Sequence, residues 1–303
     1  MLTEHISSSK ILREKLTTKP IVKVGGAFDA MSAKLVEIHE FDAVWAGSFA
    51  ISATHALPDA SILTMTEFLH AASNMVESCQ IPVIADCDTG FGGPSNVGHM
   101  VKKYEKAGVA AISIEDKIFP KQNSLLEGGT QELLSEKDFV AKLIAAKDAK
   151  TSENFMIIAR VEALIADLGV EEAIKRANAY ESAGADAILI HSKKNTPKEI
   201  FEFSEKWTGS VPLISIPTSY PTVTIDELVS HNFKMVIYAN HTLRSSYFAM
   251  SKLLESISKA NSLSEIDQKM SSMEEIFQLQ QMYDIKKQEK EIEENLKKLG
   301  YVK

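Results

Sequence analysis

The chain has 303 residues, of which 45% are hydrophobic and 24% charged, as in a globular protein with a sizeable core. Its formal net charge of -8 argues against a basic surface for nucleic acid, and no run approaches the ~20 apolar residues that span a membrane. The two cysteines have no metal-ligand spacing and the amino terminus has no signal-peptide pattern, so we expect a cytoplasmic protein.

Short apolar runs rich in β-branched residues alternate with amphipathic segments along the chain. Because the runs are apolar on both faces, they are typical of buried parallel strands. The eight runs are residues 21–28, 43–47, 81–86, 110–114, 155–161, 187–191, 212–217 and 234–239. Segments with helical period lie between them, among others 66–80, 96–107, 136–149 and 170–183. Several have a Ser or Thr placed three residues before an acid, a helix-start signal, at Thr64, Ser135, Thr196 and Thr224.

Eight strand–helix alternations predict a (β/α)₈ barrel of the TIM type, with residues 1–303 as a single domain. The alternative is an open doubly wound sheet. That fold usually has fewer strands and a Gly-rich turn after the first strand, whereas the first strand here contains only Gly25 and Gly26, with no G-x-G-x-x-G.

Two further helical runs, 242–260 and 263–298, follow the last predicted strand. One barrel needs only one helix at this point, so we treat residues 262–303 as a C-terminal helical extension. The extra run contains apolar side chains that have to be covered, namely Ile276, Phe277, Leu279 and Met282. Either it packs on a neighbouring subunit, or it folds back over its own barrel.

Charged or titratable side chains end the third to sixth predicted strands, and in a barrel these ends form the active site. They are Asp86 and Asp88, then Glu115, then Arg160 and Glu162, then His191. Carboxylates that converge in one place repel each other unless a cation lies among them. Oxygen ligands without Cys or His favour Mg²⁺ or Mn²⁺, so we predict a metal group of Asp86, Asp88 and Glu115.

Arg160 and His191 supply the positive side of this predicted site. An arginine at a barrel mouth suits bidentate binding of a carboxylate or phosphoryl group. The alternatives are a structural salt bridge for Arg160 and a satisfied strand-end histidine for His191. Residues 115–133 form a long loop with glycines and anion-binding side chains, which predicts a lid that closes over substrate; the alternative is merely a long loop.

Within this loop, the pattern E-D-K-x-x-x-K-x-N-S from Glu115 to Ser124 resembles the hallmark of the phosphoenolpyruvate mutase family, in the isocitrate lyase superfamily. Similar blocks follow the family's order over most of 20–285: DCDTGFG, ARVEA, GADAILIHSKK and VIYANHTLR. The resemblance implies a barrel whose eighth helix is swapped between the subunits of a homodimer or homotetramer. It also implies Mg²⁺ and a small-molecule substrate, through the reversible conversion of phosphoenolpyruvate to phosphonopyruvate in phosphonate biosynthesis.

The resemblance also assigns roles to individual positions. Asp86 would hold Mg²⁺ directly, with Asp88 and Glu115 acting through waters. Asp59 would lie beside the migrating phosphoryl group, which Arg160 and His191 would bind and polarise. The gating loop would include Lys121, Asn123 and Ser124, with Asn123 on the phosphoryl oxygens. Backbone N–H groups after the second strand would take the substrate carboxylate; there the family usually has S-G-L, whereas this chain has Gly47, Ser48 and Phe49.

Two other activities and one non-enzymatic function compete with this interpretation. The lyase branch carries a K-K/R-C-G-H loop, which this chain lacks, so cleavage of isocitrate or methylisocitrate is not expected. Phosphonopyruvate hydrolase, which releases pyruvate and phosphate, shares E-D-K but typically has threonine at the position of Asn123. A barrel that binds a phosphorylated ligand as a regulator is the third alternative, and the acidic metal set together with Arg160 argues against it.

Overall fold

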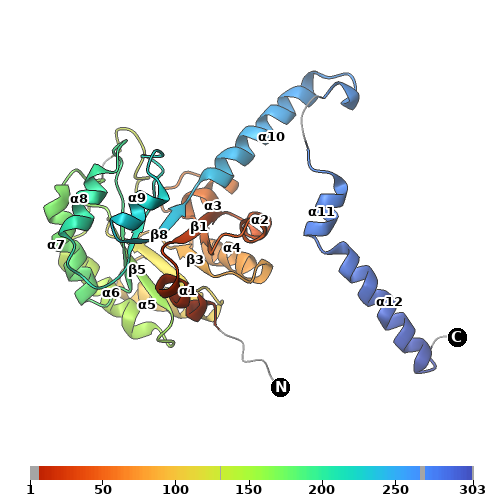
Figure 1. Ribbon diagram of the computed structural model, residues 1–303, viewed down its shortest axis with the longest axis horizontal. Coiled ribbons are helices and arrows are strands. Elements are labelled where there is room, and N and C mark those ends of the chain that lie inside the picture. Colours follow the sequence, from red (N-terminus) through yellow and green to blue (C-terminus); the bar gives the residue numbers. More distant parts are fainter. Residues whose placement is uncertain (1–6, 130, 267–269, 302–303) are drawn as a thin grey trace. The chain divides into compact units, whose positions relative to one another are not determined.

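Eight parallel strands close into a barrel in which each strand pairs with its neighbour in sequence and β8 pairs with β1 (Figure 1). This is a computed structural model that describes residues 7–129, 131–266 and 270–301. The strands are β1 (Val22–Ala27), β2 (Ala43–Ala46), β3 (Val83–Asp86), β4 (Ala111–Glu115), β5 (Met156–Val161), β6 (Ala187–Ile190), β7 (Leu213–Ser215) and β8 (Phe233–Tyr238). The closed sheet confirms the predicted (β/α)₈ barrel and excludes an open doubly wound sheet.

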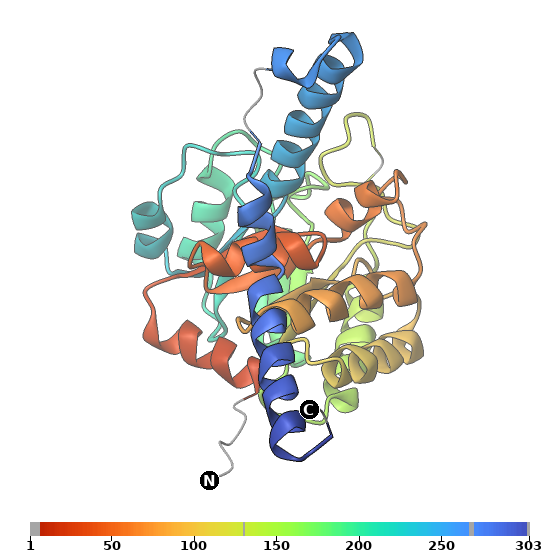
Figure 2. The same cartoon turned by 90° about the vertical axis from the view of Figure 1, so that its right-hand side faces the viewer.

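Helices surround the strands, as Figure 1 and Figure 2 show from two sides. They are α1 (Ser8–Thr18), α2 (Ala30–Ile38), α3 (Ser48–Thr54), α4 (Met65–Ser78), α5 (Pro94–Lys106), α6 (Glu136–Ala149), α7 (Gly169–Ser182), α8 (Lys198–Lys206) and α9 (Ile225–Ser230). No helix in the described part of the chain is both long and apolar enough to cross a membrane.

Three of the four predicted helix-start signals are confirmed. The side chains of Thr64, Ser135 and Thr224 each accept a hydrogen bond from the backbone N–H three residues later, so α4, α6 and α9 begin where the sequence indicated. The prediction for Thr196 was wrong. Helix α8 has Pro197 at its N-cap, which has no side-chain acceptor, and the Glu199 carboxylate accepts from the Ser192 hydroxyl rather than from the backbone of Thr196.

One hydrophobic cluster fills the barrel and a second lies between the strands and the surrounding helices. The inner cluster includes Leu12 and Leu16 of α1, a helix that the sequence analysis did not predict. Arg13 of α1 donates to the carbonyl of Asn154 and to the Asp186 carboxylate, which directly precede β5 and β6. Helix α1 therefore closes the barrel at the amino-terminal ends of its strands.

Gly26 makes the close contact between β1 and the chain that follows β8. A Cβ atom at this position would lie 2.2 Å from the carbonyl oxygen of Ala239, far inside van der Waals contact. The glycine is required here by space, because a neighbouring backbone cannot move aside as a flexible side chain can.

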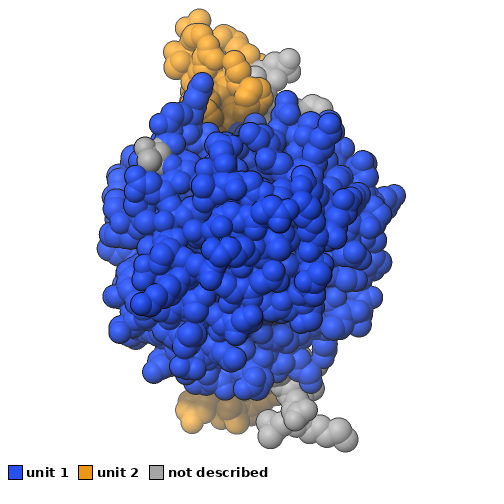
Figure 3. All heavy atoms as spheres, turned by 90° about the vertical axis from the view of Figure 1, so that its left-hand side faces the viewer, with its two compact units in different colours: residues 1–245 blue, residues 246–303 orange. Residues whose placement is uncertain are grey.

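The chain divides into two compact units, residues 1–245 and 246–303, which are blue and orange in Figure 3. The division falls inside α10 (His241–Lys259), which follows β8; η1 (Leu263–Glu265), α11 (Met273–Leu279) and α12 (Met282–Lys298) complete the second unit. The predicted continuous run 263–298 was wrong, since Gln281 adopts a left-handed backbone (φ 55°) between α11 and α12. Residues 267–269 of that run lie outside the described residues. None of α10, α11 and α12 buries a side chain fully.

Candidate active site

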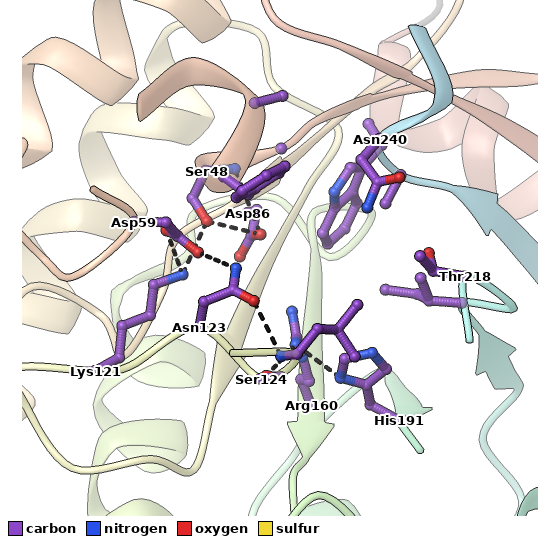
Figure 4. Close-up of a pocket in the computed structure, with 17 residues that line it drawn as sticks. Ser48, Asp59, Asp86, Lys121, Asn123, Ser124, Arg160, His191, Thr218 and Asn240 are labelled. Atoms are coloured by element: carbon purple, nitrogen blue, oxygen red, sulfur yellow. Dashed lines mark hydrogen bonds and ion pairs between the residues drawn. The ribbon is translucent and has the colours of Figure 1, made fainter. Parts of the chain in front are cut away.

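A cavity of about 160 Å³ lies at the carboxyl ends of the strands, where the barrel fold predicts the active site (Figure 4). All the site residues predicted from the sequence line it, except two that are buried beside it. Asp88 lies 2.6 Å from the Lys121 ammonium and Glu115 lies 3.4 Å from the Arg160 guanidinium, and both Lys121 and Arg160 line the cavity. The fold therefore brings the whole predicted set together.

The residues after β2 start a short helix that the sequence did not predict. Gly47 is the N-cap of α3, and Ser48 and Phe49 form its first turn at the cavity wall. The Ser48 hydroxyl donates to Asp86 Oδ2 at 2.9 Å. A side chain at Gly47 would meet the Trp45 ring at 3.0 Å, so the departure from the family's S-G-L leaves room for the indole.

Lys121 joins the acidic side of the cavity into one network. Its ammonium lies 2.8 Å from Asp59 Oδ1 and 2.6 Å from Asp88 Oδ1, and it donates to the Ser48 hydroxyl at 3.1 Å. Burial alone would lower the pKa of Lys121, but the carboxylates around it raise that pKa well above its ordinary value. Lys121 is therefore a fixed positive charge in residues 115–133, the predicted lid, which we call the lid segment.

The carboxylates outnumber this one ammonium, and two of their oxygens have no partner. Asp88 Oδ2 and Glu115 Oε1 are buried and accept no hydrogen bond from the described residues. Burial raises the pKa of Glu115 to about 7 and raises that of Asp88, despite the cations nearby. Spare buried carboxylate oxygens fit a hard divalent cation bound partly through waters. In the described part of the chain, no three His, Cys, Asp or Glu side chains are arranged to hold a metal as they stand, so the group with Asp86 remains a prediction.

Glu162 is the centre of a second network, and the sequence analysis gave it no role. Its Oε1 accepts from Arg160 Nε at 2.5 Å and lies 2.9 Å from His191 Nδ1. Although burial alone would raise the pKa of Glu162, the charges of Arg160 and Lys117 and the hydrogen bond with His191 lower it well below its ordinary value. Burial and Arg160 lower the pKa of His191, so its neutral form is favoured. Arg160 thus makes a salt bridge and also lines the cavity, which combines the two interpretations that the sequence left open.

The lid segment is held over the cavity by hydrogen bonds at several points. Asn123 Nδ2 donates to Asp59 Oδ2 at 2.7 Å, and the Lys121 backbone N–H donates to the Ser61 hydroxyl at 3.1 Å. At its ends, the Leu134 N–H donates to the carbonyl of Asp116 at 2.8 Å. Because Asn123 and Ser124 line the cavity, the segment forms part of the site rather than a separate loop.

Thr218 and Asn240, after β7 and β8, also line the cavity and were given no role from the sequence. Figure 4 shows them on the wall opposite Asp59 and Lys121. Thr218 Oγ1 and Asn240 Oδ1 are buried and have no hydrogen-bond partner among the described residues. Unpaired buried polar atoms cost free energy, so this wall is built for a polar ligand or ordered water.

Comparison with known proteins agrees with this geometry. The family model of phosphoenolpyruvate phosphomutase matches residues 12–258. Phosphonopyruvate hydrolase of Variovorax sp. (strain Pal2) is 42% identical over 91% of this chain and 95% of the relative. The crystal structure of phosphoenolpyruvate phosphomutase from Streptomyces platensis subsp. rosaceus has a TM-score of 0.91 and 43% identity, covering 93% of this chain and 98% of that one. A phosphonopyruvate hydrolase in complex with oxalate and Mg²⁺ has a TM-score of 0.87 and 40% identity, covering 93% and 97%. The chain belongs to the phosphoenolpyruvate phosphomutase family.

Proposed function

We propose that the protein is a Mg²⁺-dependent phosphoenolpyruvate phosphomutase that interconverts phosphoenolpyruvate and phosphonopyruvate in phosphonate biosynthesis. The observation that carries this proposal is the position of Asn123, whose amide lies in the lid and donates to Asp59 at 2.7 Å at the cavity wall. By the family resemblance described in the sequence analysis, asparagine at this position favours the mutase over the hydrolase, where threonine is typical. A cavity of about 160 Å³ suits a three-carbon acid with one phosphoryl group.

In this reaction, the bond from phosphorus to the enol oxygen breaks and a bond from phosphorus to the methylene carbon forms, so no atom is gained or lost. Arg160 and His191 line one side of the cavity and would bind the transferred phosphoryl group. Such a group passes through a loose, metaphosphate-like state, so positive charge and positioning do most of the work. The closed lid keeps water, the competing nucleophile, away from phosphorus.

Asp59 would lie against the migrating group from the opposite side. Both of its carboxylate oxygens already have partners, Oδ1 with Lys121 at 2.8 Å and Oδ2 with Asn123 at 2.7 Å. A carboxylate held in this way is a weaker nucleophile than a free one, which favours a shielding role over transient phosphorylation.

Asp86, Asp88 and Glu115 would hold the Mg²⁺ ion, and their spare buried oxygens support this assignment. The Mg²⁺ in the oxalate complex of the hydrolase relative supports it further. When bound, the ion would neutralise the acidic cluster and bind the oxygens of the pyruvyl part of the substrate. The N–H groups that begin α3, at Ser48 and Phe49, would take the substrate carboxylate; that of Ser48 would then leave Asp86 Oδ2, to which it donates at 3.4 Å in the structure.

The second candidate is phosphonopyruvate hydrolase, which the 42% identity to the Variovorax protein favours. Phosphorus NMR of phosphonopyruvate incubated with the protein and Mg²⁺ separates the possibilities. We expect the phosphoenolpyruvate signal to appear. Inorganic phosphate as the sole product would instead establish the hydrolase, and an unchanged spectrum would leave only a ligand-binding role.

A further inference from the structure

Two buried charged residues, Lys117 and Glu162, have no part in the proposed reaction. Their exposed fractions are 2% and 0%. Burying a charged side chain costs free energy unless ion-pair or hydrogen-bond partners offset that cost, so the partners of a buried charge indicate its role. For both residues, these partners connect the lid segment with the side chains proposed to bind the phosphoryl group.

On the lid side, the contacts meet at Ser124. Lys117 Nζ donates to the Ser124 hydroxyl oxygen at 2.7 Å and to the backbone carbonyl of Gln122 at 2.8 Å. The Ser124 hydroxyl donates in turn to Glu162 Oε2 at 2.6 Å. Lys117 lies at the base of the lid segment, two residues after β4, and Glu162 directly follows β5, so the ends of two neighbouring strands hold the middle of the lid segment through these bonds.

On the barrel side, the contacts meet at the other oxygen of Glu162. This atom, Oε1, accepts from Arg160 Nε and lies beside His191 Nδ1. Arg160 Nη2 also donates to the Ser124 hydroxyl oxygen at 3.1 Å, and it lies 2.9 Å from His191 Nδ1. The Glu162 carboxylate therefore contacts the lid segment through one oxygen and Arg160 and His191 through the other.

We propose that Ser124, Glu162 and Lys117 form a latch that couples closure of the lid to the orientation of Arg160 and His191. The proposal rests on the proposed function for the role of those last two side chains. When the lid opens, Glu162 Oε2 loses its hydroxyl donor and Lys117 loses two acceptors. The carboxylate then turns toward the Lys117 ammonium, which lies 3.3 Å away in the closed state, and loosens its hold on Arg160. The two phosphoryl-binding side chains, Arg160 and His191, are thus aligned only when the lid excludes water.

The alternative is an ordinary buried ion pair that stabilises the barrel wall whether the lid is open or closed. The two possibilities differ in the effect of Ser124, which contributes a neutral hydroxyl from the lid. A latch needs this hydroxyl, whereas a barrel-wall ion pair between Lys117 and Glu162 does not. In the latch, Glu162 and Lys117 are positioning residues that act through Arg160, His191 and the lid.

Limited proteolysis without any ligand tests the lid side. The variants are Ser124→Ala and the isosteric Glu162→Gln, with Leu126→Ala as matched control because that lid side chain is 59% exposed. We expect cleavage within residues 115–133, mapped by mass spectrometry, to be roughly tenfold faster in both latch variants, since each loses a hydrogen bond to a charged group. The control should stay within about twofold of wild type. The double variant should be cleaved no faster than the single ones, because all break the same connection.

Turnover tests the barrel side. With phosphonopyruvate and Mg²⁺, the kcat of the latch variants should be roughly tenfold or more below that of wild type, while KM changes by no more than a few-fold. Inorganic phosphate should make up a greater share of their products than of the wild-type products. Thermal unfolding run in parallel separates this from a loss of fold; should Glu162→Gln not fold, Ser124→Ala decides alone. Cleavage and kcat of Ser124→Ala close to wild type would overturn the latch. If the wild type has no mutase activity, the proposed function fails, and the proteolysis result still decides whether the lid is latched.

Discussion

Replacement of Asn123 by alanine tests the mechanism at the residue on which the proposed function depends. The change removes a hydrogen bond of 2.7 Å to the carboxylate of Asp59, whose side chain is only 5% exposed. A hydrogen bond to a charged group contributes about 1.5–3 kcal/mol. The variant would also lose the proposed contact with the phosphoryl oxygens, and a lost oxyanion donor alone costs about 2.7–4 kcal/mol of transition-state stabilisation. Turnover should therefore fall roughly 10²–10³-fold.

The assay is steady-state conversion of phosphonopyruvate to phosphoenolpyruvate, with phosphate release measured in the same samples. The Asn123→Ala variant should keep its fold and its Mg²⁺ affinity, and some phosphate should escape by hydrolysis because the lid is held less firmly. Leu126→Ala, in the same lid but exposed, is the control and should behave like wild type. If Asn123→Ala turns over within a few-fold of wild type, the lid is not the catalytic gate.

Three further predictions concern the metal, the second unit and the barrel. Excess chelator and, separately, Asp86→Ala should abolish turnover, since the acidic cluster would lose its counter-charge; full activity in chelator would refute this. Removal of residues 262–303 should cause aggregation or subunit dissociation in light scattering, because we expect the apolar side chains of the extension to pack on a second subunit; a soluble, fully active product with the same number of subunits as the full chain would contradict it. Gly26→Ala should lower the free energy of unfolding by about 3 kcal/mol or more, because the new Cβ would lie 2.2 Å from the carbonyl oxygen of Ala239. An unchanged Tm would show that β1 and the chain after β8 can move apart to accommodate it.

The strands and most barrel helices could be predicted because their signals are local. The run 155–161 is apolar on both faces apart from Arg160, and β5 occupies Met156–Val161. The start of α4 follows from the reciprocal hydrogen bonds of Thr64 and Glu67, which are three residues apart. Helix α3 has no such signal, because its N-cap is Gly47 and makes no side-chain bond. The left-handed backbone at Gln281 likewise could not be predicted, because glutamine is not a residue type that favours this conformation.

The sequence could predict which residues form the site, but not which of them contact each other. The barrel topology fixes where strand ends meet, so Asp86, Arg160 and His191 follow from strand positions alone. Lys117 and Lys121 lie four residues apart in the same loop, and the sequence does not distinguish their partners. In the structure, Lys121 binds Asp59 and Asp88, whereas Lys117 binds Glu162 and Ser124. These choices depend on distances through space, which no spacing along the chain encodes.

Helix α1 has a kinetic consequence for any reaction in the cavity. Leu12 and Leu16 join the packed interior from the amino-terminal end, so no path leads to the site through the barrel. In the proposed reaction, substrate and product would both pass the lid segment, and each turnover would require at least one opening and one closing. The frequency of opening is therefore an upper limit on kcat, however fast the bond exchange at phosphorus. Under that limit, turnover would slow in proportion to solvent viscosity.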